Sequence, residues 1–226
     1  MTDPVDTICG LSRDKVWDYE NGYYWFSDQT RLNKLLAHYE LYRRIVDLPG
    51  DVFEFGVFKG LSLIRFAQFR ALLETEQSRR IVGFDAFGKF PSEGLANPAD
   101  RTFVARFEEG AGDGLSRDEL DQILGAKGFA NVELVAGNVF DTLPRYLESR
   151  PELRLSLLHL DMDVAEPTRF VLELLFDRVV RGGLIVIDDY TAVAGATEVI
   201  DDFLRDRPLR LQKLPNYRVP AFIVRP

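Results

Sequence analysis

Residues 153–190, LRLSLLHLDMDVAEPTRFVLELLFDRVVRGGLIVIDDY, contain two apolar runs that each end in acidic residues. The first run ends at Asp161, the second ends at Asp188 and Asp189, and a stretch of helical character separates them. Apolar runs without alternation are typical of strands buried on both faces of a parallel sheet. The stretch therefore predicts a strand, a crossover helix that includes residues 167–183, and a parallel strand over 184–190.

The same alternation of strands and helices recurs along the rest of the chain. Further strands are expected within 51–60, 79–88 and 131–139, each followed by a helical pattern. The end of the chain, 209–226, reads as two extended runs joined at Pro215-Asn216, which predicts a hairpin. The fold class is therefore α/β, with a doubly wound, mostly parallel sheet and an antiparallel C-terminal hairpin.

Two segments fall outside this alternation. Residues 1–50 contain a cluster of aromatic side chains at 17–26 and a helical pattern that stops at Pro49-Gly50, so we expect an N-terminal helical and aromatic cap on a single domain over 51–226. The aromatic cluster fits either stacking on a sugar or base, or a contact within a homodimer. Residues 88–117 are rich in glycine, proline and acids, which predicts a long surface loop, either a lid or disordered.

Composition excludes several classes of protein. The chain has 226 residues, 46% hydrophobic composition and a net charge of −8, which argues against binding to nucleic acid or an anionic membrane by charge. A single cysteine, Cys9, allows no internal disulfide, and no apolar run is as long as a membrane span. The N-terminal residues lack the features of a signal peptide, so we expect a cytoplasmic enzyme.

A glycine turn follows the strand expected at 51–60. Glu54, Gly56 and Gly60 form an E-x-G-x-x-x-G pattern, and Ser62 lies just beyond it at the start of the next helix. Glycines at such a turn let a ligand approach the backbone, and the helix start offers free amides. The G-x-G-x-x-G fingerprint and the phosphate-binding loop are both absent, which lowers the odds of NAD or ATP. A turn that simply requires two glycines remains an alternative.

Asp85 strengthens the case for a nucleoside cofactor. It ends the following strand, where an acid can accept hydrogen bonds from both hydroxyls of a ribose. A nucleoside-bearing cofactor without a pyrophosphate fits this pattern, and S-adenosylmethionine is the leading candidate. Gly137 and Asn138, after the strand expected at 131–139, would then lie beside the adenine.

The acids after the two apolar runs predict a metal site. Asp161, Asp188 and Asp189 end two strands and are expected on one rim of the sheet, where several carboxylates suit a hard cation such as Mg²⁺. Such an ion can bind a substrate hydroxyl and lower its pKa beside a methyl donor. Helix capping or ion pairs with arginines are the alternative. His159 could relay a proton or be a structural core histidine, and His38 is expected at the surface.

Other functions also fit part of the pattern. Residues 161–164, DMDV, match the D-x-D-x-[TV] signature of haloacid dehalogenase-like phosphatases, in which Asp161 would be the nucleophile and Asp163 an acid–base. That signature should end the first strand of the fold, whereas here it follows three expected strands. A non-catalytic nucleotide-binding module is a further alternative, although it leaves the three acids unexplained.

Four blocks of sequence carry a resemblance to a known family. The chain resembles the macrocin O-methyltransferase family over about residues 31–224, in the blocks DVFEFGVFKG (51–60), IVGFDAFGKFP (81–91), HLDMDVAEPTRFVLELLFDRVVRGGLIVIDDY (159–190) and GATEVIDDF (195–203). The family comprises class I methyltransferases, including sugar-methylating enzymes of macrolide and aminocoumarin biosynthesis. Two of its motifs, L-D-x-D-x-x-E-P-T and G-G-x-x-x-x-D-D-Y, are specific.

The resemblance implies a Rossmann-like sheet of seven strands and Mg²⁺-dependent methyl transfer from S-adenosylmethionine to a sugar hydroxyl. By position, Asp161, Asp188 and Asp189 would bind the metal, Asp161 would also be the general base, and Glu54, Gly56 and Asp85 would hold the cofactor. The chain is also similar to a branch that methylates dTDP-6-deoxyhexoses at the 3-hydroxyl. GKFP at 88–91 departs from the family, which commonly has an acid and a glycine before Leu-Pro.

Overall fold

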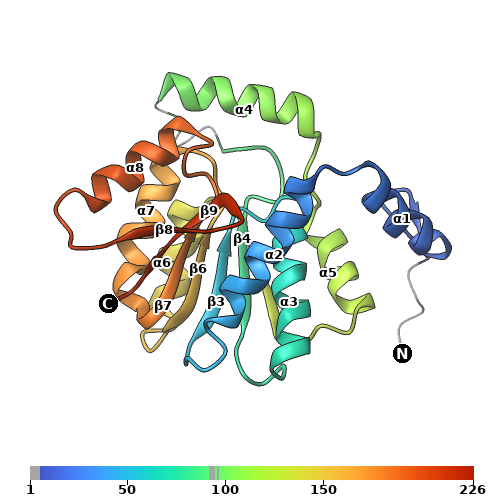
Figure 1. Cartoon of the computed structure of the whole chain (residues 1–226), viewed down its shortest axis with the longest axis horizontal. Helices are drawn as coiled ribbons and strands as arrows, with labels where there is room; N and C mark the ends of the chain where they lie inside the picture. Colours follow the sequence, from blue (N-terminus) through green and yellow to red (C-terminus); the bar gives the residue numbers. More distant parts are fainter. Residues whose placement is uncertain (1–5, 92–94, 96) are drawn as a thin grey trace.

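The computed structural model describes residues 6–91, 95 and 97–226. Its centre is a seven-stranded sheet in the order β5-β4-β3-β6-β7-β9-β8 (Figure 1). The first five strands in that order are parallel, and β9 is antiparallel to both β7 and β8, as the sequence predicts. The strands are β3 (Asp51–Phe55), β4 (Ile81–Asp85), β5 (Val132–Ala136), β6 (Leu155–Leu160), β7 (Val179–Ile187), β8 (Leu211–Leu214) and β9 (Tyr217–Val224).

Helices cover both faces of this sheet (Figure 1). Successive residues of a strand point to opposite faces, so Val52 packs into the core beneath α2, α3 and α5, whereas Phe53 packs into the core beneath α6, α7 and α8. The two layers are α2 (Gln29–Arg43), α3 (Leu61–Leu73) and α5 (Arg117–Ala126) on one face, and α6 (Val139–Glu148), α7 (Ala165–Leu175) and α8 (Ala194–Leu204) on the other.

The strand order reverses at β3. The chain passes from β3 to β4 on one side, and it returns to the other side of β3 as β6. Neighbouring crossovers therefore diverge to opposite sides at this point, which leaves a crevice beyond the carboxyl ends of the strands. The predicted site residues follow β3, β4, β5, β6 and β7, so the topology places their backbones along this edge.

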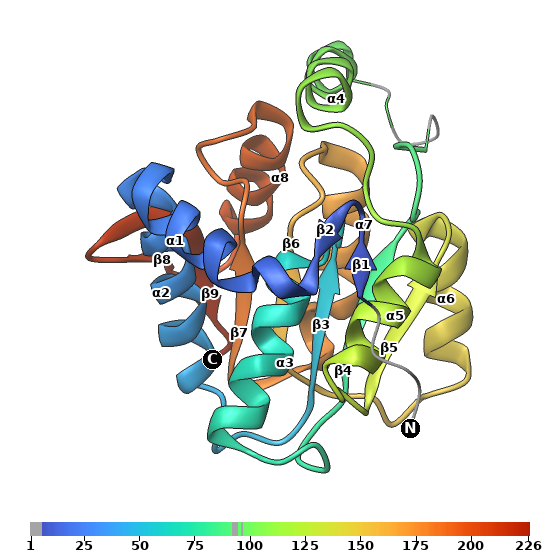
Figure 2. The ribbon, with the colours of Figure 1, turned by 90° about the vertical axis from the view of Figure 1, so that its right-hand side faces the viewer.

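A helix occupies the middle of the surface loop predicted at 88–117. Residues Pro98–Ala111 form α4, which lies beyond the carboxyl edge of the sheet (Figure 2). The Asn97 side chain accepts a hydrogen bond from the Ala99 amide and caps the helix. Pro98 occupies the first turn, where a backbone N–H would have no partner within the helix, so its missing N–H costs nothing. The loop prediction gave too much weight to glycine and proline content and missed this start signal. Part of the predicted loop, 92–94 and 96, lies outside the described residues.

The other differences concern element boundaries and the N-terminal region. Strand β7 begins at Val179, after a short 3-10 helix, η2 (Phe176–Arg178), so the helix predicted to reach Gly183 ends earlier. The aromatic cluster lies largely on α1 (Val16–Phe26), where Trp25 and Phe26 are 71% and 86% exposed. The short β1 (Thr7–Ile8), β2 (Leu11–Ser12) and η1 (Arg13–Lys15) precede it. None of the helices in the described ranges is long and apolar enough to cross a membrane.

Candidate active site

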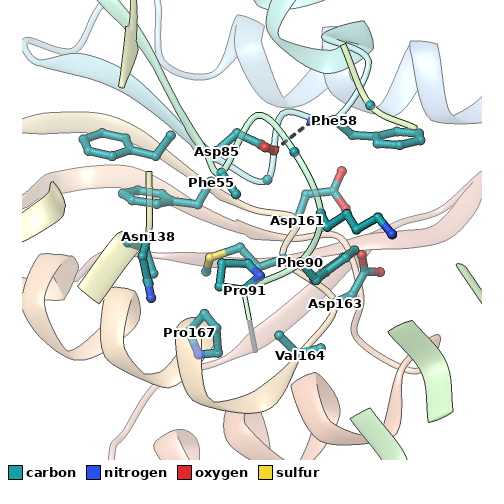
Figure 3. A pocket seen from close by; sticks show the side chains of 18 of the residues that line it. Phe55, Phe58, Asp85, Phe90, Pro91, Asn138, Asp161, Asp163, Val164 and Pro167 are labelled. Atoms are coloured by element: carbon teal, nitrogen blue, oxygen red, sulfur yellow. Dashed lines mark hydrogen bonds between the residues drawn. The ribbon is translucent and has the colours of Figure 1, made fainter. Parts of the chain in front are cut away.

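A pocket opens where β3, β4, β5 and β6 end, and five of the predicted site residues line it (Figure 3). They are Gly56, Asp85, Gly137, Asn138 and Asp161. Much of the remaining lining is apolar, from Phe55, Phe84, Val139, Phe140, Met162 and Pro167. The pocket thus combines an apolar wall with backbone and carboxylate groups at the strand ends, the composition expected of a small-molecule site.

Gly56 allows the ends of β3 and β6 to approach each other. Its φ of 87° lies in the left-handed region, and a Cβ atom at this position would lie 1.7 Å from the carbonyl oxygen of Asp161. Any other residue would push the two strand ends apart. The glycine therefore fixes the distance between the turn after β3 and the acids after β6.

Asp85 organises the loops on both sides of it. Its Oδ2 accepts hydrogen bonds from the amides of Val57 and Phe58, at 2.7 and 2.9 Å, and its Oδ1 accepts one from the Phe87 amide at 2.6 Å. Figure 3 marks the bond from Phe58. A carboxylate oxygen can accept more than one hydrogen bond. Asp85 can therefore hold the turn and still accept hydrogen bonds from a ligand in the pocket.

Three residues predicted to hold the cofactor lie behind the turn. Glu54, Gly60 and Ser62 are not among the described residues that line the pocket. Glu54 is fully buried and accepts a hydrogen bond from Ser62 Oγ at 2.5 Å, and burial raises the pKa of Glu54 to about 8. A Cβ on Gly60, whose φ is 73°, would lie 2.6 Å from Leu120 Cδ1. These residues shape the turn and the start of α3 from inside the protein.

A group of three carboxylates lies at the acidic end of the site. Asp161, Asp163 and Asp189 each offer an oxygen within 4.8 Å of the others; we call them the carboxylate cluster. The Asp163 amide donates a hydrogen bond to Asp189 Oδ2 at 2.9 Å, and Asp163 has a φ of 64°. Asp163 thus adopts a left-handed backbone conformation that is uncommon for aspartate, and it does so beside the carboxylates of Asp161 and Asp189.

Burial and mutual repulsion perturb all three carboxyl groups. Burial and the charge of Asp161 raise the pKa of Asp163 to about 7. Burial, together with the neighbouring carboxylates, raises the pKa values of Asp161 and Asp189 well above their ordinary range. From the sequence, Asp163 was assigned a role only in the phosphatase alternative. The D-x-D spacing was the signal that both acids face one site.

Asp188, a predicted metal ligand, lies outside this cluster. Its Oδ2 accepts a hydrogen bond from Lys34 Nζ of α2 at 2.6 Å, and its Oδ1 lies 3.8 Å from Nε2 of both His38 and His159. Although burial opposes ionisation, both imidazoles and the ammonium hold the pKa of Asp188 well below its ordinary value. Adjacent residues at a strand end face opposite sides, so Asp188 continues the face of Val186 toward α2.

The two histidines lie behind the pocket. His159 is fully buried, with Nδ1 4.0 Å from Glu54 Oε2, and it is not among the described residues that line the pocket. The prediction that His38 is at the surface is wrong, because it is 1% exposed with its ring centroid 5.3 Å from that of His159. Burial lowers the pKa of His38 to about 4, so its imidazole is neutral at neutral pH.

Sequence comparisons place the chain among methyltransferases. The profile of the Macrocin-O-methyltransferase (TylF) family matches residues 12–214. The 8-demethyl-8-(2,3-dimethoxy-alpha-L-rhamnosyl)-tetracenomycin-C 4'-O-methyltransferase of Streptomyces olivaceus is 29% identical over 160 residues, which are 69% of this chain and 58% of that protein. Demethyldecarbamoylnovobiocin O-methyltransferase of Streptomyces niveus is 26% identical over 166 residues, 70% of this chain and 59% of that protein. The match thus spans less than two thirds of either relative.

Solved structures share the fold. CalS11, described in its apo form as a TDP-rhamnose 3'-O-methyltransferase of calicheamicin biosynthesis, is 29% identical with a TM-score of 0.67, and the match covers 94% of this chain and 87% of CalS11. The O-methyltransferase NovP has a TM-score of 0.74 at 22% identity, with 85% of this chain and 79% of NovP covered. The predicted sheet, with its antiparallel C-terminal strands, is confirmed by the strand order and by these matches.

Proposed function

The chain belongs to the Macrocin-O-methyltransferase (TylF) family, and from this premise we propose that it is an S-adenosylmethionine-dependent O-methyltransferase assisted by a divalent cation. Its acceptor is a hydroxyl of a sugar or of a nucleotide-linked deoxysugar. The observation that carries the proposal is one pocket at the switch point of the sheet, in which apolar side chains lie beside the carboxyl groups of Asp85, Asp161 and Asp163.

The cofactor fits the part of the pocket around Gly56, Asp85 and Gly137. The aromatic and aliphatic wall, which includes Phe140, matches the apolar faces of an adenine ring. Both oxygens of Asp85 already accept hydrogen bonds from backbone amides of the turns, but each can accept a further one. Asp85 would use these free lone pairs to accept hydrogen bonds from the ribose hydroxyls. Glu54 and Ser62 would act indirectly, because their mutual hydrogen bond supports the turn that the cofactor contacts.

The proton of the acceptor hydroxyl would pass to a carboxylate. The hydroxyl oxygen attacks the methyl group, the positively charged sulfonium leaves as a neutral thioether, and the hydroxyl proton must be taken up. Asp161 and Asp163 line the same pocket, so either can contact a hydroxyl placed beside the methyl donor. In the metal-free protein burial raises the pKa of Asp163 to about 7, so this carboxyl can exchange a proton near neutral pH. His159 is fully buried and is not among the described residues that line the pocket, so we assign it no contact with the acceptor.

The carboxylate cluster fits a hard divalent cation such as Mg²⁺. Three mutually repelling carboxylates within 4.8 Å of one another form an all-oxygen donor set, and a cation would offset their repulsion. Asp161, Asp163 and Asp189 would hold the ion, which when bound would lower the pKa of the acceptor hydroxyl. Lys34 contacts the carboxylate of Asp188 in this structure, and the part of Asp188 in holding the ion stays a prediction.

The acceptor class rests on the relatives. Their names describe methylation of a rhamnosyl group in a tetracenomycin and of TDP-rhamnose. By analogy, this chain would methylate a deoxysugar, either on a nucleotide carrier or on a glycosylated product. The phosphatase alternative loses its support for two reasons. The DMDV segment follows β6, the fourth parallel strand along the chain, whereas the phosphatase signature should end the first. The chain also matches the profile of a methyltransferase family.

A radiolabelled methyl-transfer assay tests this function. Purified protein, labelled S-adenosylmethionine and Mg²⁺ would be incubated with a dTDP-6-deoxyhexose or with a rhamnosylated aglycone, and we expect label in one of the two. Asp161→Asn should abolish transfer while S-adenosylhomocysteine still binds, whereas the exposed Asp206→Asn should retain full activity. Cofactor binding without transfer to either acceptor would refute the sugar assignment.

A further inference from the structure

Two histidines and an aspartate come together inside the protein. His38 of α2, His159 of β6 and Asp188, which follows β7, are all buried, and each offers a donor atom within 4.8 Å of the others. Nε2 of each imidazole lies 3.8 Å from Asp188 Oδ1. We call these three residues the histidine cluster. Its members come from three segments that are distant in the sequence, so the fold itself brings the donor atoms together.

The polar atoms of the histidine cluster have no partners in the protein. Within the part of the chain that the structure describes, both nitrogens of His38, both nitrogens of His159 and Asp188 Oδ1 are buried without a hydrogen bond. The separations of 3.8 Å are too long for direct hydrogen bonds between the imidazoles and the carboxylate. Buried polar groups are rarely left unpaired in native proteins. The two Nε2 atoms and Oδ1 therefore indicate a bound group that lies between them.

A divalent transition-metal ion would satisfy these three atoms at once. Bonds from Zn²⁺ to imidazole nitrogen or carboxylate oxygen are about 2.0–2.2 Å long, so an ion can join two donor atoms up to about 4.2 Å apart. The distance of 3.8 Å from Oδ1 to each Nε2 lies within that reach. Imidazole and carboxylate together suit Zn²⁺, whereas Mg²⁺ prefers oxygen ligands alone. Burial keeps the His38 imidazole neutral, the form that binds a metal ion, because it lowers its pKa to about 4.

Glu54 lies next to the ring nitrogen of His159 that faces away from Asp188. Its Oε2 is 4.0 Å from Nδ1 of His159, whereas Nε2 approaches Asp188. In the described part of the chain this Oε2 is buried without a hydrogen bond, while Ser62 donates to the other oxygen. Metal-binding histidines usually donate their second ring N–H to a carboxylate or carbonyl, which orients the ring. Glu54 is in the position of such an acceptor, and a small rotation of the ring would complete the bond.

We propose that His38, His159 and Asp188 form a binding site for Zn²⁺ or a chemically similar ion, separate from the carboxylate cluster. The two groups share no residue. Lys34 contacts Asp188 Oδ2, so the ion binds the other oxygen, Oδ1. A carboxylate can bind through both oxygens, so this site is compatible with the predicted part of Asp188 in holding Mg²⁺. The ion would link α2 to the ends of β6 and β7 and thereby stabilise the edge of the sheet.

Electron paramagnetic resonance of bound Cu²⁺ tests the proposal without an activity assay, because the chain contains only two histidines. Cu²⁺ accepts imidazole ligands as Zn²⁺ does. The spin-echo modulation from the remote imidazole nitrogen counts the rings bound to the ion. In untagged protein that has been treated with a chelator and given one equivalent of Cu²⁺, we expect two imidazoles. A spectrum with one imidazole or none would overturn the proposal.

Equilibrium dialysis with Zn²⁺ tests the same site through its ligands. We expect one Zn²⁺ per wild-type chain, and His38→Gln or His159→Asn should each raise the dissociation constant at least about a hundredfold. Zn²⁺ should also raise the midpoint of thermal unfolding of the wild type but not of His38→Gln. Equal Zn²⁺ binding by the wild type and a folded histidine variant would overturn the proposal. If neither variant folds, the Cu²⁺ spectrum of the wild type still decides.

Asp163→Asn is the matched control, because it alters the carboxylate cluster and leaves the histidine cluster intact. It should bind Zn²⁺ within about threefold of the wild type. Loss of Zn²⁺ binding in this variant would place the ion among the carboxylates and overturn the proposal. The site goes beyond the proposed function, and titration of the wild type with S-adenosylhomocysteine keeps the two apart. Failure of that titration would refute the methyltransferase assignment, whatever the Zn²⁺ data show.

Discussion

Lys34 Nζ lies 2.6 Å from Asp188 Oδ2, whereas the adjacent Asp189 accepts a hydrogen bond from the Asp163 amide on the opposite side of the strand end. Two neighbouring acids therefore belong to different environments. Asp188 is ionised and enclosed by cationic or polar partners, and Asp189 shares a crowded group of carboxylates. This separation divides the acids into Asp188, which contacts Lys34 of α2, and the carboxylate cluster, of which Asp161 and Asp163 line the pocket.

Replacing Glu54 by Gln should change how stability depends on pH. Burial raises the pKa of Glu54 from 4.5 to about 8, so between these values the folded protein keeps a proton that the unfolded chain releases. Wild-type stability should therefore fall as pH rises from about 4.5 to 8, by as much as about 1.4 kcal/mol for each pKa unit of the shift. Gln keeps the neutral form at every pH and should lack this loss. Urea unfolding at several pH values would reveal it, and parallel curves for the two proteins would contradict the assignment.

Asp163→Asn should separate activity from stability. The variant loses a carboxylate that can accept a proton and hold a cation, so methyl transfer should fall by at least about a hundredfold. It also removes a charge that burial and Asp161 make unfavourable, so at pH 8 the midpoint of thermal unfolding should rise by a few degrees. Asp206→Asn, at an exposed position, should change neither quantity. Retained activity in Asp163→Asn would remove this residue from the reaction.

Gly195→Ala should loosen α4 from the rest of the protein. A Cβ on Gly195 would lie 2.2 Å from Asp100 Oδ1, and Asp100 is a buried residue of α4 whose Oδ2 accepts a hydrogen bond from the Ala165 amide at the start of α7. Displacing Asp100 should cost about 1–3 kcal/mol of unfolding free energy and weaken cofactor binding, because Phe107 of α4 lines the pocket. Urea unfolding and faster proteolysis within α4 would report the loss.

The matched control for this change is Gly125→Ala in α5. A Cβ at Gly125 meets nothing within 4 Å, so the substitution should stabilise the protein slightly through helix propensity. Equal stability of the Gly195→Ala and Gly125→Ala proteins would mean that the contact between Asp100 and Gly195 does not hold α4 in place.

The sequence predicted the sheet and the location of the site because both follow from local patterns. Unbroken apolar runs that end in acids identify buried parallel strands, and the ends of such strands share one edge, which places Asp85 and Asp161 together. A period of two along a strand also separates Asp188 from Asp189, which lie in different groups of acidic and histidine side chains.

Other features depend on contacts that no local pattern records. Lys34 and His38 lie on an N-terminal helix, and their partner Asp188 comes from the far end of the chain, so neither the salt bridge nor the burial of His38 could be read from neighbouring residues. The burial of Glu54 behind the glycine turn depends likewise on how α3 packs over β3. In α4, the start signal at Asn97-Pro98 was present but was outweighed by the surrounding glycines.

Calorimetric titration with S-adenosylhomocysteine tests the central claim most directly. Ala86 lines the pocket, and Ala86→Phe would fill it without removing any hydrogen-bonding side chain, whereas Ala126→Phe adds the same bulk at an exposed position of α5. We expect micromolar binding by the wild type and by Ala126→Phe, and binding at least about tenfold weaker by Ala86→Phe. No binding by the wild type, or equal binding by the wild type and Ala86→Phe, would contradict the placement of the cofactor in this pocket.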